Sequence, residues 1–322
     1  MWRIPASGGT PQPFVGVSNA SAPSISSKGD RLAFEHEASH DAIWRIELAD
    51  EKHPRGPARL VIGTNARKGR PNFSPDGKKI AFESAQAGHL GPSEIWTCNS
   101  DGSNCAELTS LQGTAGTARW SPDGRYIAFE FHPGERSEIY VADLDGGPPR
   151  LVPTLPGADN LAPNWSRDGR WIYFASNRGG STWQLWKVPV AGGTPVQITR
   201  HGGVYGIESA DGRSLYYAKS ETPGIWKMPL DGGEETRVLS QSGGDGWYDW
   251  ALTPNGIYFV NCDTIPRATL AFFEFATHRI VPIVALDKPP GSGLALAPDG
   301  RSVLYIQNEF FEWNIMLVKN YR

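Results

Sequence analysis

A short turn of the Ser-Pro-Asp-Gly type recurs along this chain at nearly constant intervals, and it constrains the fold more than any other feature. Two complete copies are Ser74-Pro75-Asp76-Gly77 and Ser121-Pro122-Asp123-Gly124. Counting every copy, the final glycines are Gly29, Gly77, Gly124, Gly169, Gly212, Gly256 and Gly300. Successive glycines are separated by 48, 47, 45, 43, 44 and 44 residues. Such a period is typical of one four-stranded blade of a β-propeller.

The composition of this turn has a structural explanation. Proline presets φ at its second position, aspartate hydrogen-bonds to its own backbone, and glycine adopts the left-handed conformation. We therefore interpret the repeated aspartates as turn formers rather than as ligands or catalytic acids. The tryptophans of the predicted third strands, such as Trp96 and Trp186, are interpreted in the same way, as packing between blades.

Each repeat also contains segments that are expected to form strands. Apolar residues alternate directly after the turn, as in Lys-Ile-Ala-Phe at residues 79–82, which is typical of a strand. A second such segment follows, and a glycine-rich hairpin turn such as Asp231-Gly232-Gly233 then leads into a last strand. The sequence therefore predicts an all-β fold: a single seven-bladed β-propeller of four-stranded antiparallel blades.

The two ends of the chain bear on how the ring closes. The last segment, residues 313–318, is typical of a third strand, and a matching fourth strand occurs at residues 11–15. We expect this N-terminal strand to close the last blade, because closure removes exposed sheet edges. Residues 1–9 duplicate a third strand and its turn, so they are expected to form a surplus partial-blade strand. Residues 1–322 are thus predicted to be one propeller domain that belongs to a longer protein.

Charge and hydropathy limit the classes of function. The net charge is −3 at pH 7 and no five like charges are consecutive, so the basic footprint of a nucleic-acid-binding domain is missing. No stretch is long and apolar enough to span a bilayer. The first residues have neither the basic nor the apolar region of a signal peptide. We expect a monomeric domain without a membrane segment.

The three cysteines give information about the cellular compartment in which the protein works. Cys98 and Cys105 flank a turn at residues 99–102, so a cross-hairpin disulfide and two free thiols are both open. Cys262 is expected to be a free thiol. An oxidised pair would indicate that the protein works outside the reducing cytosol.

The blade sequence resembles a known repeat. Residues 120–129 read Trp-Ser-Pro-Asp-Gly-Arg-Tyr-Ile-Ala-Phe, and Glu-Ile-Tyr-Val-Ala-Asp follows at residues 138–143. This pattern is similar to the TolB-type WD-like β-propeller repeat. Relatives with this repeat include TolB, a protein-binding component of the periplasmic Tol–Pal system. They also include propellers that precede the hydrolase domain of prolyl oligopeptidase-like peptidases, and sensory or scaffolding domains of bacterial regulators.

The resemblance implies a bacterial binding or scaffold propeller in a periplasmic or other extracytoplasmic location. A sensory domain of a bacterial regulator is an alternative that the same resemblance allows. The chain departs from TolB itself, because the N-terminal α/β domain of that family is missing and seven turn copies occur instead of six. The resemblance therefore does not transfer a Tol–Pal role to this chain.

Two enzymatic alternatives can be weighed from the residues. An α/β-hydrolase carries its nucleophile in Gly-x-Ser-x-Gly, and no such pentapeptide occurs. A metal-assisted lyase or lactonase remains the alternative, because propellers of that kind hold a metal at the channel mouth; the candidates are His36, His132 and His201, with Glu208. These histidines belong to separate blades and lack a ligand spacing motif. We therefore favour a non-catalytic protein and expect neither a metal nor a cofactor.

A glycine-rich loop carries the best binding candidates. Residues 243–250 read Gly-Gly-Asp-Gly-Trp-Tyr-Asp-Trp, on the face where the loops from fourth to first strands emerge. Trp247 and Tyr248 are residue types that anchor interfaces, and Asp249 lies beside them, whereas Trp250 is expected to pack between blades. Further polar candidates at the starts of first strands near the same channel mouth are Arg70, Arg119, Asn164 and Tyr205. These residues predict a propeller that binds a protein or peptide, with a glycan as the second choice.

Glu208 is the anomaly of the repeat. It stands four residues before Gly212, where other repeats have Phe73 or Trp120. A buried carboxylate without a partner is costly, so Glu208 should be paired, solvated or directed into the channel as part of the binding site. A local register shift that moves Ile207 into the apolar position is the alternative.

Overall fold

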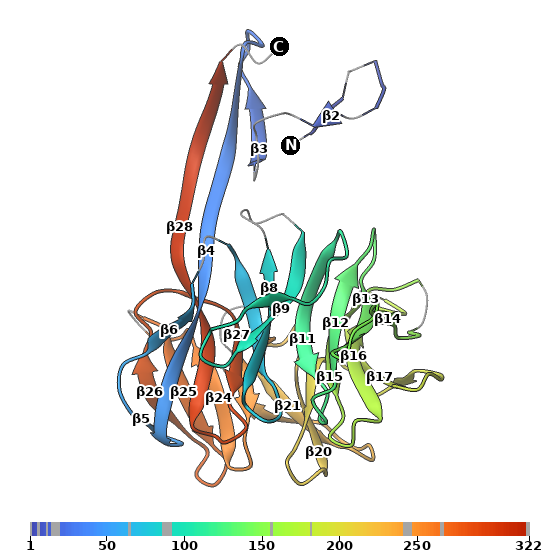
Figure 1. Ribbon diagram of the computed structural model, residues 1–322, viewed down its shortest axis with the longest axis vertical. Coiled ribbons are helices and arrows are strands. Elements are labelled where there is room, and N and C mark those ends of the chain that lie inside the picture. The colour runs from blue at the N-terminus through green and yellow to red at the C-terminus, as the bar shows by residue number, and fades with distance from the viewer. Residues whose placement is uncertain are drawn as a thin grey trace.

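The computed structural model describes residues 2–4, 7–10, 12–13, 20–63, 66–85, 92–154, 157–180, 182–240, 247–264 and 267–319. All regular structure in these residues is β-strand, and the strands form seven antiparallel sheets. Figure 1 shows a body of short strands and a long projection, with both chain ends beside that projection. The predicted fold, an all-β propeller of four-stranded antiparallel blades, is confirmed.

Five of the sheets are four-stranded blades, each built from one continuous stretch of chain. Blade 1 contains β7 (Lys68–Phe73), β8 (Lys79–Ala85), β9 (Ser93–Asn99) and β10 (Ala106–Glu107). Blade 2 contains β11 (Thr114–Trp120), β12 (Tyr126–His132), β13 (Glu138–Asp143) and β14 (Arg150–Leu151). Blade 3 contains β15 (Asn160–Trp165), β16 (Trp171–Ser176), β17 (Gln184–Pro189) and β18 (Val196–Gln197). Blade 4 contains β19 (Val204–Glu208), β20 (Ser214–Ala218), β21 (Ile225–Pro229) and β22 (Thr236–Leu239). Blade 5 contains β23 (Trp250–Leu252), β24 (Gly256–Asn261), β25 (Thr269–Glu274) and β26 (Arg279–Ala285).

The ring is completed by a sheet that we call the closing blade, because its strands come from both ends of the chain. Its inner strands are β27 (Pro290–Leu296) and the first part of β28 (Ser302–Lys319). Its outer strands are the second half of β4 (Arg31–Asp50) and β6 (Arg59–Ile62), with β5 (His53–Pro54) in a small hairpin on β4. β27 packs against β7 of blade 1, and this contact closes the ring.

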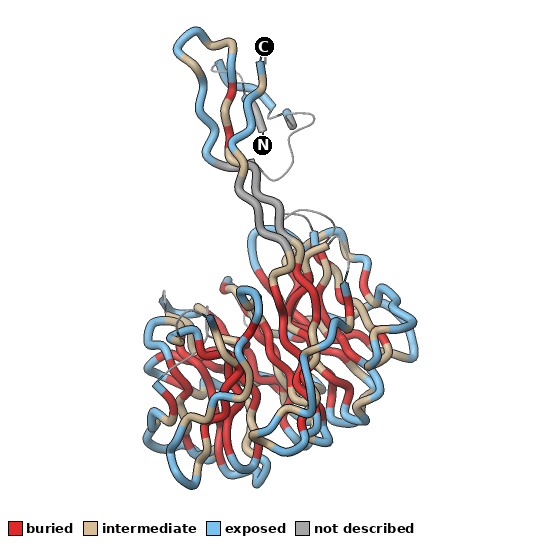
Figure 2. Tube along the Cα trace, turned by 90° about the vertical axis from the view of Figure 1, so that its left-hand side faces the viewer, coloured by how far each residue is buried: buried red, intermediate tan, exposed pale blue. Residues whose placement is uncertain are grey.

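β4 and β28 continue beyond the closing blade and form, with β3 (Ala20–Ile25), a projecting sheet that we call the arm (residues 20–42 and 308–319). Within the arm, Phe34 pairs with Met316 and Leu32 with Val318. Figures 1 and 2 show the arm standing clear of the ring. β1 (Trp2–Arg3) and β2 (Gln12–Pro13) form a separate two-stranded hairpin.

All seven repeats form strands, but one of them is divided between the arm and the ring. Six of the repeated turns join the first two strands of a ring blade, whereas the turn at residues 26–29 joins β3 to β4 in the arm. The ring thus contains six four-stranded sets of strands. The repeat that begins with β3 gives its first two strands to the arm and its last two to the closing blade.

The predicted strands of the last blade need a correction. Residues 313–318 do not fold back onto residues 302–307 as a third strand, because they continue β28 and pair with residues 32–37 of β4. The third strand of the closing blade is instead the second half of β4, and its fourth strand is β6. In the predicted fourth strand at residues 11–15, only Gln12 and Pro13 lie within the described residues, and they pair with β1.

The long strands β4 and β28 each run through a place where the other repeats have a turn between their second and third strands. The lack of turn-forming residues explains this difference. In blades 1 to 5 the connection between the second and third strands contains glycine or proline, as at Gly134 and Pro223. Residues 31–50 and 302–319 contain neither residue type. Because nothing in these two segments interrupts an extended backbone, each continues as one long strand.

The repeated turns have the predicted structure. In blade 1 the amide of Gly77 donates to the carbonyl of Ser74 at 2.8 Å. Asp76 Oδ1 accepts a hydrogen bond from Ser74 Oγ at 2.6 Å and one from the amide of Lys78 at 3.1 Å. The bond from Ser74 and then that from Lys78 hold the pKa of the Asp76 carboxyl below its ordinary value of 3.8. The turn aspartate is thus occupied in building the turn.

Tryptophans at the ends of inner strands join neighbouring blades. Trp165 of β15 is 7% exposed, and its indole Nε1 donates to the carbonyl of Arg119 in blade 2 at 3.0 Å. Trp120 of β11 makes the equivalent bond to the carbonyl of Asn72 in blade 1 at 3.2 Å. Figure 2 shows that buried residues run through the ring strands. The core is therefore a series of contacts between blades.

Candidate functional site

Two arginines and two tyrosines from different blades form a continuous stack among the innermost strands. The guanidinium carbon of Arg119 lies 4.8 Å from the ring centre of Tyr205. The rings of Tyr205 and Tyr248 are 5.2 Å apart, and the guanidinium carbon of Arg70 lies 4.5 Å from the Tyr248 ring. Both contacts between arginine and tyrosine have cation–π geometry. We call these four residues, all of them predicted from the sequence, the Arg–Tyr stack.

A β-bulge in the inner strands directs these side chains. The pairing register shifts between Gly69 and Asn72 in blade 1, and equivalent shifts occur in β11, β15 and β19. Arg70 and Tyr205 occupy the bulges with φ of 48° and 49°. Non-glycine residues rarely adopt such values, and bulges commonly re-aim a side chain near a functional site. The repeat thus places special backbone positions around the ring and fills two of them with stack residues.

Small residues leave room for the long side chains of the stack. β27 lies between blades 5 and 1, and there a Cβ at Gly293, whose φ is +123°, would stand 2.6 Å from the Cα of Arg70. On the other side, β15 lies between β11 and β19, and its bulge residue is the fully buried Ala162. A side chain at Gly293 would collide with the backbone of Arg70, and the small Ala162 lies in β15, the strand between Arg119 and Tyr205.

Three carboxylates fix the bulges and one of the arginines. Glu83 accepts two 2.8 Å bonds from Nη1 of Arg70, and its Oε2 also accepts the amide of Thr117 in blade 2 at 3.1 Å. One blade further, Glu130 accepts the amide of Ala162 at 2.7 Å. Asp249 accepts the amide of Gly293 in the closing blade at 2.6 Å. Each carboxylate therefore holds the bulge of the next blade, which gives it a positioning role.

The two arginines of the Arg–Tyr stack differ in their ion pairing. Burial by itself would lower the pKa of Arg70, but the carboxylate of Glu83 raises it above its ordinary value, so this arginine is a fixed cation. Burial raises the pKa of the Tyr248 phenol, which therefore stays protonated. Arg119 is 3% exposed and donates one bond, at 2.7 Å, to the carbonyl of Ala118. Within the described residues its Nε has no hydrogen-bond partner and no carboxylate lies within ion-pair distance.

Two tryptophans flank the stack at the loop face, the face from which the connections between second and third strands emerge. Trp247 is half-buried, and its ring centre lies 6.4 Å from that of Trp183 and 6.4 Å from that of Tyr248. Trp250 is buried as expected, and its indole donates to the carbonyl of Trp247 at 3.1 Å. Residues 243–246 of the predicted loop lie outside the described residues. Trp247 and Trp183 are the accessible aromatics beside the stack.

Glu208 does not join this group. Its Oε2 accepts the amide of Arg167 at 2.9 Å and its Oε1 accepts the Tyr173 hydroxyl at 2.7 Å, both in blade 3 and next to the repeated turns. It pairs with Leu215 as Trp165 pairs with Ile172. The alternative in which a register shift moves Ile207 into the apolar position is therefore wrong. Where Trp165 bonds the preceding blade through its indole, Glu208 bonds the preceding blade through its carboxylate.

Asn164 also serves the packing between blades. Its side-chain amide donates to the carbonyl of Gly206 in blade 4 at 3.0 Å, and its carbonyl oxygen accepts the amide of Trp165 at 3.0 Å. Both polar atoms are thus engaged within the ring. Among the predicted binding residues, the structure brings together Arg70, Arg119, Tyr205, Trp247, Tyr248 and Asp249, and leaves Asn164 and Glu208 apart.

The three candidate histidines come from different parts of the molecule. His36 belongs to the arm, His132 ends β12, and His201 precedes β19. The side chain of His36 lies outside the described residues. Among the side chains that are described, no three of His, Cys, Asp and Glu gather as a metal site would require.

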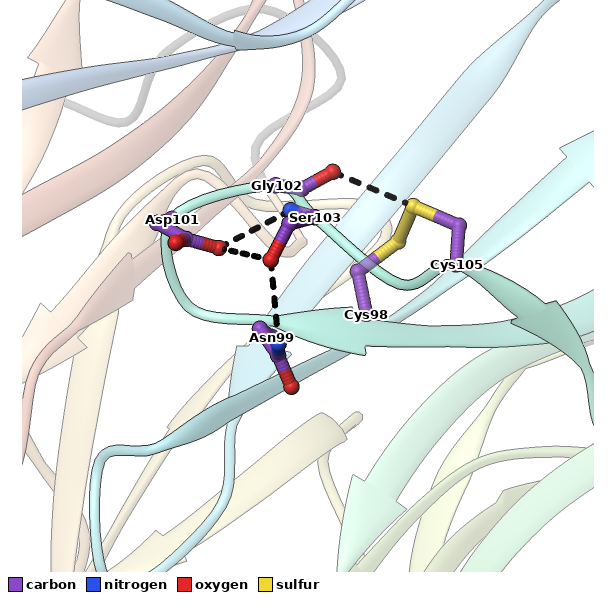
Figure 3. The surroundings of a disulfide bond; sticks show 6 residues. All are labelled: Cys98, Asn99, Asp101, Gly102, Ser103 and Cys105. Atoms are coloured by element: carbon purple, nitrogen blue, oxygen red, sulfur yellow. Dashed lines mark hydrogen bonds between the residues drawn. A yellow bond between two sulfur atoms is a disulfide. The ribbon is translucent and has the colours of Figure 1, made fainter.

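Cys98 and Cys105 form a disulfide across the hairpin that joins β9 to β10 (Figure 3). Inside the hairpin, Asp101 Oδ1 accepts bonds from the amide and hydroxyl of Ser103 at 2.9 and 2.6 Å. At its tip, a Cβ on Gly102 would stand 2.1 Å from the carbonyl oxygen of Val61 in β6. The cross-linked hairpin therefore packs against the closing blade, at the seam of the ring. Cys262 takes no part in this disulfide and is exposed.

Glu83, Glu130, Thr117 and Trp183 were not predicted as site residues. A signal for the two glutamates was present, since each follows its turn glycine by six residues, Gly77 and Gly124 respectively. Nothing in the repeat indicates Trp183, because its contact with Trp247 joins a loop of blade 3 to the connection between blades 4 and 5.

Comparison with known proteins places this architecture in a family. The TolB β-propeller domain family matches residues 71–270. The chain belongs to the TolB β-propeller family. A TolB homolog of Chlorobium chlorochromatii is 39% identical over 201 residues, which are 61% of this chain and 44% of the homolog. An uncharacterized protein of Agrobacterium fabrum is 27% identical over 231 residues, 58% of this chain and 77% of that protein.

Solved structures agree on the fold of this TolB-type propeller. A protein of Agrobacterium tumefaciens assigned as TolB superposes with a TM-score of 0.65 at 21% identity, covering 84% of this chain and 99% of that one. TolB from Acinetobacter baumannii superposes with a TM-score of 0.59 at 19% identity, covering 86% of this chain and 65% of that one. At these identities the likeness shows the fold alone. None of the described residues forms a helix long and apolar enough to cross a membrane.

Proposed function

We propose that this TolB-type propeller is a non-catalytic recognition domain that binds a protein or peptide on its loop face. Trp247 and Trp183 would contact the partner at the rim, and the Arg–Tyr stack would form the floor beneath them. Aromatic residues and arginine are the types that dominate binding energy at protein interfaces. The family supports a binding role at a coarse level.

One observation carries the proposal: among the described residues the guanidinium of Arg119 has no acidic partner, and it stacks on Tyr205, from which the ring contacts lead through Tyr248 to Trp247. A buried cation without an acidic partner is unfavourable by itself. A carboxylate from a partner would complete its hydrogen bonds in a nearly water-free place, where such bonds are strong. The proposed partner is therefore a peptide segment with an acidic group close to apolar side chains.

Selection of displayed peptides on the immobilised full chain tests this proposal. We expect acidic peptides to be enriched, and Trp247→Ala to weaken their binding by about tenfold or more, as for an interface hot spot. Arg119→Lys keeps the charge but loses the planar donor group, so it should also weaken binding. Leu151→Ala, on the exposed outer strand of blade 2, is the control and should leave binding unchanged.

Two results would contradict the proposal. Peptides whose affinity is unchanged by Trp247→Ala and by Trp183→Ala would place the binding surface elsewhere. Failure to enrich any peptide would argue against peptide recognition. For the alternative of a metal-assisted lyase or lactonase, one equivalent of an ion that copurifies with the chain and is lost with His132→Ala would favour the enzyme.

The disulfide supports an extracytoplasmic location as part of this proposal, because such bonds persist in oxidising compartments. The matched part of the Chlorobium TolB homolog is less than half of that protein. A sensory or scaffold role within a longer bacterial protein is therefore the alternative to peptide recognition. Fractionation of the native host with a thiol-trapping reagent tests the location. A fully reduced Cys98 in trapped cells would contradict it.

A further inference from the structure

The arm exposes positions that every ring blade buries. Ile315 pairs with Glu35 in the arm as Ile95 pairs with Glu83 in blade 1. Ile95 is fully buried, and so are the residues at the same position in blades 2, 3 and 4, which are Ile139, Leu185 and Ile225. Ile315 is 82% exposed. Its environment differs because no neighbouring blade lies beside it.

The first strand of the arm repeats this contrast. Ile25 stands four residues before its turn glycine, as Phe73, Trp120 and Trp165 do in the ring. Those three are 6%, 8% and 7% exposed, whereas Ile25 is 58% exposed. Met316 and Leu317 of β28 are also exposed, at 44% and 52%. The arm therefore carries the apolar positions of a blade without the blades that would cover them.

The described part of the arm has three strands, β3, β4 and β28. In the described residues, positions 308–319 of β28 pair with β4 and with no other strand, so the opposite edge of β28 is open. In the segment predicted to be a fourth strand, the two described residues, Gln12 and Pro13, pair with β1. The outer strands of blades 2 and 3 are only two residues long and thus offer little edge. A long open edge is a template for pairing with another chain.

We propose that a second copy of this chain covers this edge, by antiparallel pairing of β28 with β28 of the other copy about a two-fold axis. Antiparallel pairing of one strand with itself satisfies the symmetry of such a dimer. Residues 314–318 are Asn-Ile-Met-Leu-Val and carry no charge, so no like charges meet across the axis. Lys319 of each copy falls at opposite ends of the paired strands.

The geometry of the arm favours this occupant. Figures 1 and 2 show the arm standing clear of the ring, so the ring does not block a second arm. Ile315 and Leu317 are two residues apart and share one face of β28, so both copies would place them on the same side of a continuous sheet. Main-chain hydrogen bonds would supply affinity, and these apolar side chains would shield each other. The proposal replaces the expectation of a monomeric domain and does not depend on the proposed binding function.

Light scattering coupled to gel filtration tests the proposal on the full chain. We expect a mass of twice 35.1 kDa that falls toward the single-chain mass on dilution. Ile315→Lys brings two like charges to the symmetric edge and should raise the dimer dissociation constant by about tenfold or more. Leu151→Lys adds the same charge to an exposed apolar position of the ring and should leave the mass unchanged. Unchanged thermal unfolding of both variants shows that they are folded.

A single cysteine identifies the contact. In a Cys262→Ser background, Ile315→Cys should form a covalent dimer under mild oxidation, while Leu151→Cys should not. A wild-type chain that stays monomeric at every concentration would overturn the proposal. So would a dimer that is unaffected by Ile315→Lys, because the contact would then lie elsewhere.

Discussion

The ring and the arm are built from the same repeat, yet they differ in what surrounds each strand. In the ring every blade has a neighbour on both sides, and apolar residues such as Trp165 of a first strand and Ile95 of a third strand are buried. In the arm the same pairing register and the same kind of turn leave Ile25 and Ile315 largely exposed. Strand pairing within a sheet therefore does not by itself create the core of this propeller. Contacts between blades create it, and we expect them to contribute most of the free energy of unfolding.

We expect the greatest difference in the free energy of unfolding when an apolar side chain is removed from the ring and from the equivalent position of the arm. Trp165→Ala removes a buried indole and its bond to Arg119, and should lower the free energy of unfolding by about 3–5 kcal/mol. Ile25→Ala at the equivalent arm position should cost below about 1 kcal/mol, since the side chain is already mostly in water. Chemical denaturation followed by tryptophan fluorescence measures both. Equal losses would mean that the arm is as well packed as the ring.

Buried charge gives the second comparison. Glu83→Gln leaves Arg70 without its ion pair and should lower the free energy of unfolding by about 3 kcal/mol. Glu35 stands at the same repeat position in the arm, where it is half-exposed, so Glu35→Gln should cost below about 1 kcal/mol. Urea denaturation of the two variants in the same buffer provides the measurement. A larger loss of unfolding free energy for Glu35→Gln than for Glu83→Gln would contradict the view that the buried ion pair of the ring stabilises the fold more.

The seam of the ring gives a third, smaller effect. Replacing Cys98 and Cys105 together by serine should lower the free energy of unfolding by about 2 kcal/mol, because a short closed loop is released in the unfolded chain. Cys262→Ser, on an exposed residue, is the control and should change little. Thermal unfolding of the two variants compares them. No loss in the double variant would show that the hairpin does not support the seam.

The smallest effect concerns a carboxylate near the surface of blade 4. Burial raises the pKa of Glu235, but Lys219 and the hydroxyl of Tyr217 outweigh it and hold the pKa below its ordinary value of 4.5. The contribution of Glu235 is therefore present above pH 4.5 and is lost as the pH falls through the lower folded value. Glu235→Gln should cost below about 1 kcal/mol at neutral pH. Denaturation curves at several pH values should converge for wild type and variant in acid; divergence there would contradict the sign.

The repeat predicted the blades, but it could not predict which strands close the ring. Residues 43–46 and 315–318 are both apolar third-strand segments, so either can pair with residues 302–307. The choice depends on long-range pairing, which local propensity does not encode. A local signal did exist, since glycine and proline are missing from both straight connections. It becomes informative only by comparison with the other five connections.

The candidate site was predictable where it follows the repeat. Arg70 and Tyr205 stand at the same repeat position, and Tyr248 precedes a predicted inner strand. Which of the polar residues would meet was not predictable, because Arg119 reaches past one blade to contact Tyr205. Glu208 shows the same limit, since the sequence marked it as unusual and only the fold showed that Tyr173 and Arg167 pair with it.

The pairing of β4 with β28 separates the arm from the ring, and paired cysteines can detect it. Ala33 pairs with Leu317 in this structure, whereas a repeat folded as one continuous blade would pair Ala33 with Arg45. In the Cys262→Ser background, we predict that Ala33→Cys with Leu317→Cys forms an intrachain disulfide and that Ala33→Cys with Arg45→Cys does not. The opposite result would contradict this pairing and would mean that the arm belongs to the ring as an ordinary blade.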